Sequence, residues 1–260
     1  MNIKQVYAVY FSSTGGTRAY VEGIAGRLDK YYQTIDLTNP ETRARTYHFS
    51  AEDLVLLGAP VYGGRLPQVQ GGIFDRLQGD HTPAVWMVSY GNREFDDALL
   101  EEQEICSKQG FVGIAAASWI APHTFSARIA EGRPDAADTA RMDEFAEKLR
   151  ERLKGELPVA PLALPGNHPY KVFAGMPMHP VANEACTECG SCAAVCPTAA
   201  IDRNYPKEVD GDRCINCFAC VKHCPEHARG IDHPMFLQTV QKLEGMLLNR
   251  RKEPEFFFAE

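Results

Sequence analysis

Eight cysteines between residues 186 and 224 constrain this chain more than any other feature. They form two copies of the spacing Cys-x2-Cys-x2-Cys-x3-Cys-Pro, one running from Cys186 to Pro197 and the other from Cys214 to Pro225. Zinc sites take four ligands in two pairs, and a disulfide framework would imply a secreted chain. Two tandem runs of four cysteines therefore favour polynuclear metal clusters, with three cysteines of each run wrapping around one cluster.

This spacing is the one that binds 4Fe–4S clusters, and residues 181–233 resemble two-cluster bacterial ferredoxins. In that family the fourth cysteine of each run serves the other cluster. The resemblance therefore implies two mixed ligand sets. The first set is Cys186, Cys189, Cys192 and Cys224, and the second is Cys214, Cys217, Cys220 and Cys196.

Length and charge limit the classes of protein to which this chain could belong. The chain has 260 residues, 45% of them hydrophobic, which is enough for one large or two smaller domains. Its formal net charge is −7 and no long basic stripe appears, so we expect no nucleic-acid partner. The opening residues lead directly into a strand-like run, and no apolar run is long enough to span a membrane. We therefore expect a cytoplasmic protein.

The first 154 residues alternate between strand-like and helix-like patterns. The predicted strands are 3–11, 33–37, 53–59, 84–89 and 112–118. The predicted helices are 17–28, 71–77, 95–110 and 135–154. Such alternation is typical of a doubly wound α/β fold with a parallel sheet. In these sheets the ligand lies outside the carboxyl ends of the strands, where the loops 12–17, 60–66 and 89–93 are expected here.

The loop after the first strand has the composition of a phosphate site. It reads Ser12-Ser13-Thr14-Gly15-Gly16-Thr17 and leads into a helix. The glycines allow backbone N–H groups to converge, the hydroxyls add donors, and the helix N-terminus adds a favourable dipole. It is neither a Walker A loop nor a dinucleotide fingerprint. An ordinary strand–helix connection remains an alternative.

Residues 1–153 resemble flavodoxins in three loops. The loop 12–17 matches their FMN-phosphate loop, Pro60-Val61-Tyr62-Gly63-Gly64 resembles the loop flanking the flavin ring, and Ser89-Tyr90-Gly91-Asn92-Arg93 resembles the loop around its pyrimidine edge. The resemblance implies FMN as cofactor, bound by these three loops. It also implies a flavodoxin-like sheet of five parallel strands in the order 2-1-3-4-5.

Each FMN-binding residue has a local chemical reason. Tyr62 and Tyr90 can stack on the flat flavin ring, and Gly91 and Asn92 can offer backbone donors to its pyrimidine edge. The Gly63–Gly64 peptide matches the one that changes conformation with redox state in the family. Two departures stand out, because no tryptophan lies beside Tyr62 and Arg93 replaces the usual acidic cluster. Alternatively, the two tyrosines cap the sheet and Asn92 is a turn residue.

Beyond residue 154 the amino-acid composition changes. Residues 155–182 are rich in proline, and we predict an ordered connector that buries several apolar side chains. We expect a small ferredoxin-like α+β cluster domain at 183–233, then a C-terminal region, 234–260, with an amphipathic helix at 235–250. The tail Phe256-Phe257-Phe258 either docks on the body, docks on a neighbouring chain or is disordered. The apolar side chains that we expect to be buried within the connector 155–182 are Val159, Leu162, Leu164, Tyr170, Val172, Phe173, Met176 and Met178.

Two further side chains are candidates. Cys106, outside the cluster runs, is expected to be a buried apolar residue of the 95–110 helix. His123 follows the fifth strand near the binding edge, where it either approaches the flavin or has a structural role. No other grouping of histidines suggests a metal site.

FMN and 4Fe–4S clusters on one chain favour a low-potential electron carrier that docks with partner oxidoreductases. The clusters would act as a wire and the flavin as the place where electrons are paired. A flavin-dependent reductase of a small molecule, fed by the clusters, is the alternative, and a redox sensor is a third reading. The sequence leaves open whether clusters serve the flavin of their own chain or that of a second chain in a homodimer.

Overall fold

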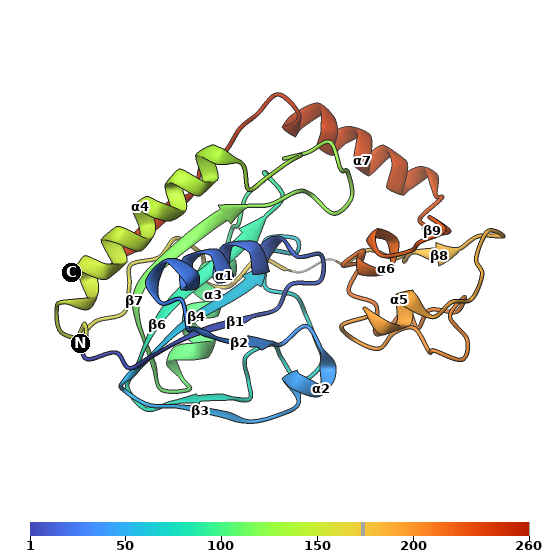
Figure 1. The fold of residues 1–260 in the computed structure, drawn as a ribbon. Helices are drawn as coiled ribbons and strands as arrows, with labels where there is room; N and C mark the ends of the chain where they lie inside the picture. The colour runs from blue at the N-terminus through green and yellow to red at the C-terminus, as the bar shows by residue number, and fades with distance from the viewer. Residues whose placement is uncertain (173–174, 260) are drawn as a thin grey trace.

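The computed structural model of the chain describes residues 1–172 and 175–259. Its centre is a sheet in the order β10-β7-β6-β4-β1-β2, in which every pairing is parallel except that of β10 with β7 (Figure 1). The predicted order of the five parallel strands is confirmed, and a sixth strand extends it. The strands are β1 (Gln5–Tyr10), β2 (Gln33–Asp36), β4 (Asp53–Pro60), β6 (Thr82–Tyr90), β7 (Phe111–Ile120) and β10 (Glu255–Phe258).

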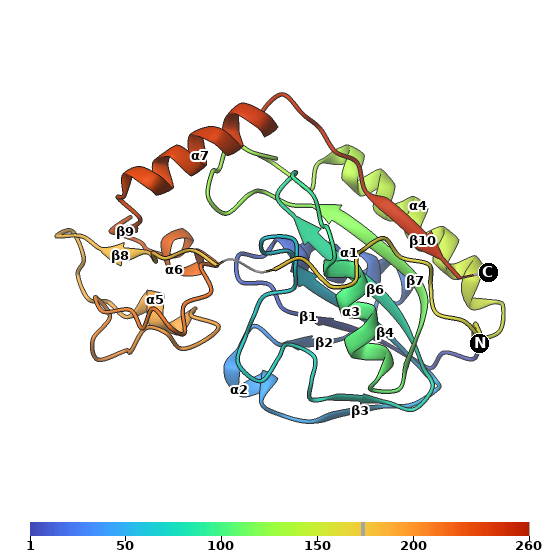
Figure 2. The same cartoon turned by 180° about the vertical axis from the view of Figure 1, so that it is seen from behind.

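Helices cover both faces of the sheet, as Figures 1 and 2 show. Helices α1 (Gly16–Leu28) and α4 (Ala136–Leu153) lie on one face, and α3 (Ala98–Ser107) lies on the other. Successive strand residues serve opposite faces, so Ala8 packs in the α1–α4 core and Val9 in the α3 core. Because both faces are covered, the central strands are apolar runs rather than alternating ones.

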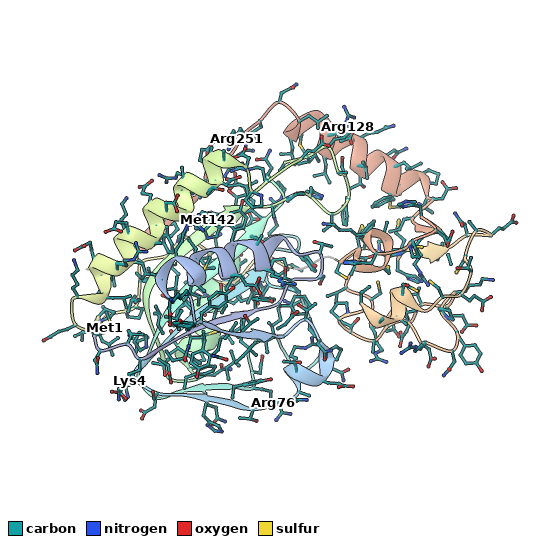
Figure 3. All side chains as sticks on the ribbon, in the orientation of Figure 1. Met1, Lys4, Arg76, Arg128, Met142 and Arg251 are labelled. Carbon is teal, nitrogen blue, oxygen red and sulfur yellow. The ribbon has the colours of Figure 1, made fainter. Side chains whose placement is uncertain are left out.

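Close approach of α1 to α4 depends on small residues. A Cβ at Gly23 would lie 2.9 Å from Met142 Sδ, so the glycine lets the α4 side chain reach α1 (Figure 3). Asp135 starts α4 with a capping box, in which its carboxylate accepts from the Asp138 amide. Phe145 and Leu149 are buried on the same side of α4 as Met142.

The helix predicted at 71–77 is wrong. Gly71 and Gly72 both have positive φ, which ends a helical path, and the segment forms turns before a short strand. Several short elements were not predicted, because four or fewer residues carry no periodicity. They are α2 (Pro40–Arg43), β3 (Tyr47–Phe49), β5 (Leu77–Gly79), β8 (Val181–Ala182), α5 (Ser191–Ala194), α6 (Ala219–Lys222) and β9 (Arg229–Gly230).

The connector follows the α3 side of the sheet only in part. Leu162 is buried and Leu164 packs against the same core, as predicted. Val159 and Val172 are exposed, contrary to prediction. Met176 and Met178 pack beside Phe218 of the cysteine-rich region, and Phe173 lies outside the described residues.

The C-terminal region returns to the sheet. Helix α7 (Pro234–Leu247) starts beside the cysteine-rich region, and the tail then forms β10 (Figure 2). Phe256 packs on Trp119 and Phe145, with ring centroids 5.3 and 4.9 Å apart. The three phenylalanines therefore dock on the body of their own chain.

Helix α3 carries two buried glutamates in contrasting environments. Glu101 accepts hydrogen bonds from Arg65 and from the Leu66 amide, at 2.7–2.9 Å. Glu102 is 0% exposed, and within the described part of the chain its carboxylate has no charged partner, only the nearby Met87 backbone, which slightly offsets the effect of burial on its pKa. Burial raises the pKa of Glu102 well above its usual value. Nearby Cys106 is buried as expected, and burial raises its pKa too.

We expect Glu102→Gln to stabilise the protein and Glu101→Gln to destabilise it. A carboxyl with a raised folded-state pKa favours folding below about pH 4.3, and this contribution falls as pH rises toward the folded pKa. Thermal unfolding should therefore show a higher melting temperature for Glu102→Gln than for wild type at pH 8, and this difference should shrink toward pH 5. Glu101→Gln should lose about 1–3 kcal/mol because it leaves Arg65 without its carboxylate. Equal losses for both variants would contradict this assignment.

Candidate functional site

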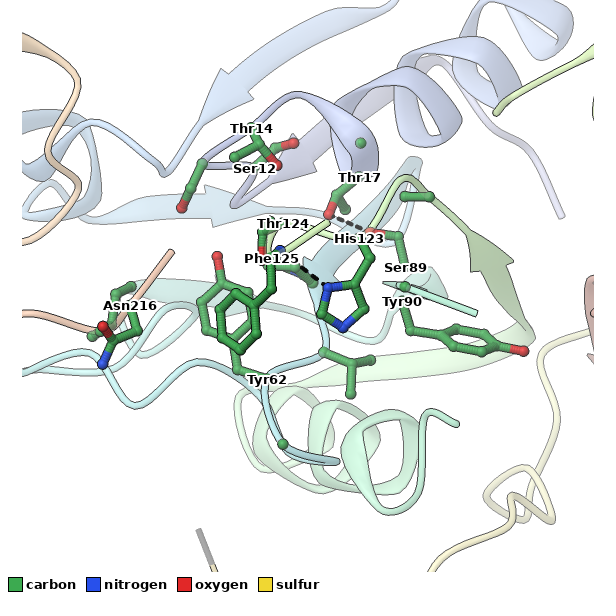
Figure 4. A pocket seen from close by; sticks show the side chains of 18 of the residues that line it. Ser12, Thr14, Thr17, Tyr62, Ser89, Tyr90, His123, Thr124, Phe125 and Asn216 are labelled. Atoms are coloured by element: carbon green, nitrogen blue, oxygen red, sulfur yellow. Dashed lines mark hydrogen bonds between the residues drawn. The ribbon is translucent and has the colours of Figure 1, made fainter. Parts of the chain in front are cut away.

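A cavity of about 370 Å³ opens at the carboxyl ends of the parallel strands (Figure 4). This volume is within the range of roughly 300–1,000 Å³ typical of small-molecule sites. Three predicted loops line it, through Ser12, Ser13, Thr14, Gly16, Thr17, Pro60, Val61, Tyr62, Gly63, Ser89, Tyr90 and Gly91. Four predicted residues, Gly15, Gly64, Asn92 and Arg93, do not line it.

The loop 12–17 has the features that a phosphate group needs. Gly15 has φ +87° and directly precedes α1, so the loop turns sharply into the helix N-terminus. The Ser13 hydroxyl is buried and lies close enough to the Tyr62 hydroxyl and the Cys217 thiol to favour their ionised forms, which partly offsets the rise that burial causes in both pKa values. Thr17 Oγ1 lies 2.7 Å from Ser89 Oγ, which joins the first and third loops. A loop that turns through Gly15 directly into the N-terminus of α1 fits a phosphate group.

The two predicted stacking tyrosines differ in orientation. Tyr62 lines the cavity from a tight turn, in which its amide donates to Arg65 O and in which Gly63 and Gly64 both have positive φ. Tyr90 instead directs its ring away from Tyr62 into the core, 5.7 Å from the Phe95 ring (Figure 4). The predicted stacking role of Tyr90 is therefore corrected, because β6 ends with that side chain on the α3 face.

Three other predicted residues contact protein rather than the cavity. Asn92 holds the chain that follows α7, Arg93 pairs with Asp96, and Gly64 lies so close to Asp96 that a Cβ would fall 2.2 Å from its carboxylate. The side chains of Asn92 and Arg93 therefore have protein partners. The FMN contacts predicted for the backbone of Gly64 and Asn92 and for Arg93 stay predictions. Gly91 does line the cavity, and a Cβ there would lie 2.4 Å from the His123 ring.

A fourth loop, residues 121–125, also lines the cavity and was mostly missed. It leaves the carboxyl end of β7, so its position in the parallel sheet was the available signal. His123 Nδ1 accepts from the Phe125 amide at 3.1 Å. Burial, assisted by Arg93, lowers the His123 pKa to about 4, so this imidazole is neutral at pH 7. The Phe125 ring forms an aromatic wall of the cavity, a position that the sequence analysis had assigned to Tyr90.

The cysteines gather around two smaller cavities. One is lined by Cys186, Cys189, Cys192 and Cys224, and the other by Cys196, Cys214, Cys217 and Cys220. Each cavity thus combines three cysteines of one run with the last cysteine of the other. Within residues 1–172 and 175–259, no three His, Cys, Asp or Glu side chains converge closely enough to hold a single metal ion.

The cysteine-rich region borders the large cavity. Cys214 and Ile215 line both this cavity and the one that contains Cys217. Burial and, secondarily, the nearby Cys217 thiol raise the pKa of Tyr62. Lys222 Nζ donates to Thr14 O at 2.9 Å, and Arg43 Nη2 donates to Pro197 O at 2.7 Å. The Phe125 and Phe218 ring centroids lie 4.9 Å apart.

Comparison with protein families identifies both regions. A family model described as a flavodoxin domain matches residues 7–71, and one described as a 4Fe–4S dicluster domain matches residues 180–225. The chain joins a flavodoxin domain to a 4Fe–4S dicluster domain. These two domains support an electron-transfer protein of the FMN and iron–sulfur type, and the turn of the loop 12–17 into α1 agrees with FMN. No helix in the described part of the chain is long and apolar enough to cross a bilayer.

Three of the solved structures similar to this chain are flavodoxins. One from the domain Archaea is 12% identical and covers 58% of this chain and 100% of its own, with a TM-score of 0.39. A Streptococcus pneumonia TIGR4 flavodoxin is 17% identical, with coverages of 57% and 99% and a TM-score of 0.40. Flavodoxin 2 from Bacillus cereus is 16% identical, with the same coverages and TM-score. A search of curated proteins found no match.

Proposed function

We propose that this protein relays electrons within one chain, between FMN and two 4Fe–4S clusters, and exchanges them with redox partner proteins. FMN supplies both one- and two-electron chemistry, whereas a cluster moves single electrons. The flavodoxin domain occupies residues 1–154, the connector 155–182, the dicluster domain 183–233 and the C-terminal region 234–260. These boundaries separate two sets of cofactor-binding residues that meet at one cavity wall.

The observation that carries this proposal is the wall shared by two cavities. Cys214 and Ile215 line both the flavodoxin cavity and the adjacent cysteine cavity. A cofactor in one is thus separated from a cofactor in the other by single side chains. Ser13 and Tyr62 lie on the flavin side of this wall and Cys217 on the other. Such proximity within one chain favours transfer without a second copy.

We assign the cofactor ligands from the same geometry. Cys214, Cys217, Cys220 and Cys196 hold the cluster beside the flavin, and Cys186, Cys189, Cys192 and Cys224 hold the distal one. Cys189 is exposed, whereas Cys217 is buried. External partners therefore exchange electrons at the distal cluster. In the flavin site, the loop 12–17 holds the phosphate, and Tyr62 with Phe125 flanks the ring.

Flash photoreduction of the fully loaded protein tests the relay. We expect flavin and cluster absorbance to re-equilibrate in a first-order phase whose rate is independent of protein concentration. A rate proportional to protein concentration would place the transfer between chains and overturn the proposal. Rapid oxidation of NAD(P)H by the purified protein alone would also contradict a carrier and favour the reductase alternative.

A further inference from the structure

Asn92 has a role that its place beside the flavin loop does not suggest. It is 2% exposed, and its side chain makes three hydrogen bonds to the backbone of the C-terminal chain. Its Nδ2 donates to Leu247 O at 3.2 Å and to Arg250 O at 2.7 Å, and its Oδ1 accepts from the Lys252 amide at 3.1 Å. Asn92 thus caps the last turn of α7 and holds the first residues beyond it.

The segment 248–258, which we call the strap, is anchored along its length. Buried Arg133, paired with Asp138, donates to Lys252 O at 2.7 Å. Glu94 pairs with Arg250 and Lys252, at 3.0 and 2.6 Å. The strap ends in β10, which pairs with β7. Its backbone is therefore held by the flavodoxin domain at several successive residues.

The opposite end of α7 contacts the dicluster domain beside a cluster ligand. Phe236 packs on Phe218, which follows Cys217, with ring centroids 5.6 Å apart, and on Phe125 at 5.4 Å. In its last turn, Glu244 accepts from Ser126 and Arg128 of the flavodoxin domain, at 2.6 and 2.8 Å. Helix α7 has 14 residues, about 21 Å, and is a stiff link between strap and cluster.

We propose that Asn92 is a positioning residue for electron transfer: by fixing the C-terminal end of α7, it keeps the Cys217 cluster against the flavin cavity. This inference rests on the relay proposed above. The dicluster domain contacts the flavodoxin domain directly, for example through Lys222 and Thr14. The connector tethers it at one side, and α7 with the strap tethers it at the other. Loss of the second tether leaves both cofactors bound but lets their separation vary, and tunnelling rates fall steeply with distance.

The variant Asn92→Gly tests the contribution of the Asn92 side chain while leaving the backbone conformation unchanged. Asn92 has φ +62°, a conformation that glycine adopts without strain, so this variant deletes three hydrogen bonds and keeps the turn. His81→Gly is the matched control, because His81 has φ +51°, is exposed and lies in the turn before β6, at the amino end of the strands. A second variant, Glu94→Gln, weakens the strap through its two ion pairs and leaves Asn92 intact.

We expect Asn92→Gly to retain wild-type FMN affinity and iron content. The fraction of molecules in which the dicluster domain is detached from the flavodoxin domain should rise about tenfold, because buried hydrogen bonds are lost. The internal electron-transfer phase should slow and become dependent on solvent viscosity, because the dicluster domain must re-dock. Hydrogen exchange at the Lys252 amide should also accelerate. Glu94→Gln should show the same changes more weakly, and His81→Gly should show none.

Three results would overturn the inference. Unchanged transfer in both Asn92→Gly and Glu94→Gln would show that the strap does not position the cluster. Loss of FMN affinity in Asn92→Gly, with iron intact, would make Asn92 a flavin ligand instead. If Asn92→Gly does not fold, unchanged transfer in Glu94→Gln is decisive alone. Failure of the relay itself appears separately, as the absence of a first-order phase in the wild type.

Discussion

In a Gly15→Val variant, we expect FMN binding to be lost while iron content stays at the wild-type level. Gly15 turns the chain into α1 at φ +87°, where a β-branched residue is strained. A valine there also displaces the backbone N–H groups that must converge on the phosphate. Flavin absorbance after reconstitution with excess FMN, with iron measured in the same sample, checks the result.

Gly71→Val controls for backbone strain alone. Gly71 has φ +78°, and, as at Gly15, a Cβ added there meets no atom within 4 Å. Both variants therefore carry similar strain without a steric clash, but only Gly15 adjoins the proposed phosphate site. Normal flavin occupancy in Gly15→Val would mean that the phosphate lies elsewhere. Equal flavin loss in both variants would attribute the effect to general destabilisation.

Cys217→Ser and Cys189→Ser should have the same effect on iron content and opposite effects on electron transfer. Each removes one thiolate from a proposed four-cysteine set, so each should lose one cluster and about half of the iron. Cys217 lies by the wall of the flavin cavity, whereas Cys189 is exposed at the distal site. The first-order phase between flavin and cluster should therefore vanish in Cys217→Ser and persist in Cys189→Ser.

Flavin content distinguishes this result from a general folding defect. Both variants should bind FMN, because the flavodoxin domain has its own cores on the two faces of its sheet. Loss of flavin in Cys189→Ser would contradict the separation of the domains. A first-order phase that survives in Cys217→Ser but disappears in Cys189→Ser would reverse our order of the two clusters.

The phosphate loop and the cysteine runs were predictable because their chemistry is local. Gly15 needs positive φ at one position, and residues 12–17 follow one another along one turn. The cysteine spacing likewise reflects one tight loop around each cluster. The parallel strand order was also accessible, since apolar runs such as Leu54–Ala59 indicate strands that are covered on both faces.

Tyr90, Asn92 and β10 show where such prediction stops. Whether the Tyr90 ring enters the cavity or the core depends on which face of β6 it occupies at the strand end. Asn92 caps a helix that ends 155 residues further along the chain. No local sequence pattern links residues that are so far apart. The tail residues 255–258 are apolar in sequence, but their partner, β7, is decided by the free edge of a sheet.

The amino-acid sequence by itself determined which cofactors this protein can hold, since each cofactor is recognised by side chains and backbone within a few consecutive residues. Only the tertiary structure decided how the two sites are arranged. It placed Cys214 and Ile215 in the wall of the flavin cavity and turned Asn92 toward the strap. These contacts join segments more than a hundred residues apart, and packing of whole elements, rather than local propensity, selects them.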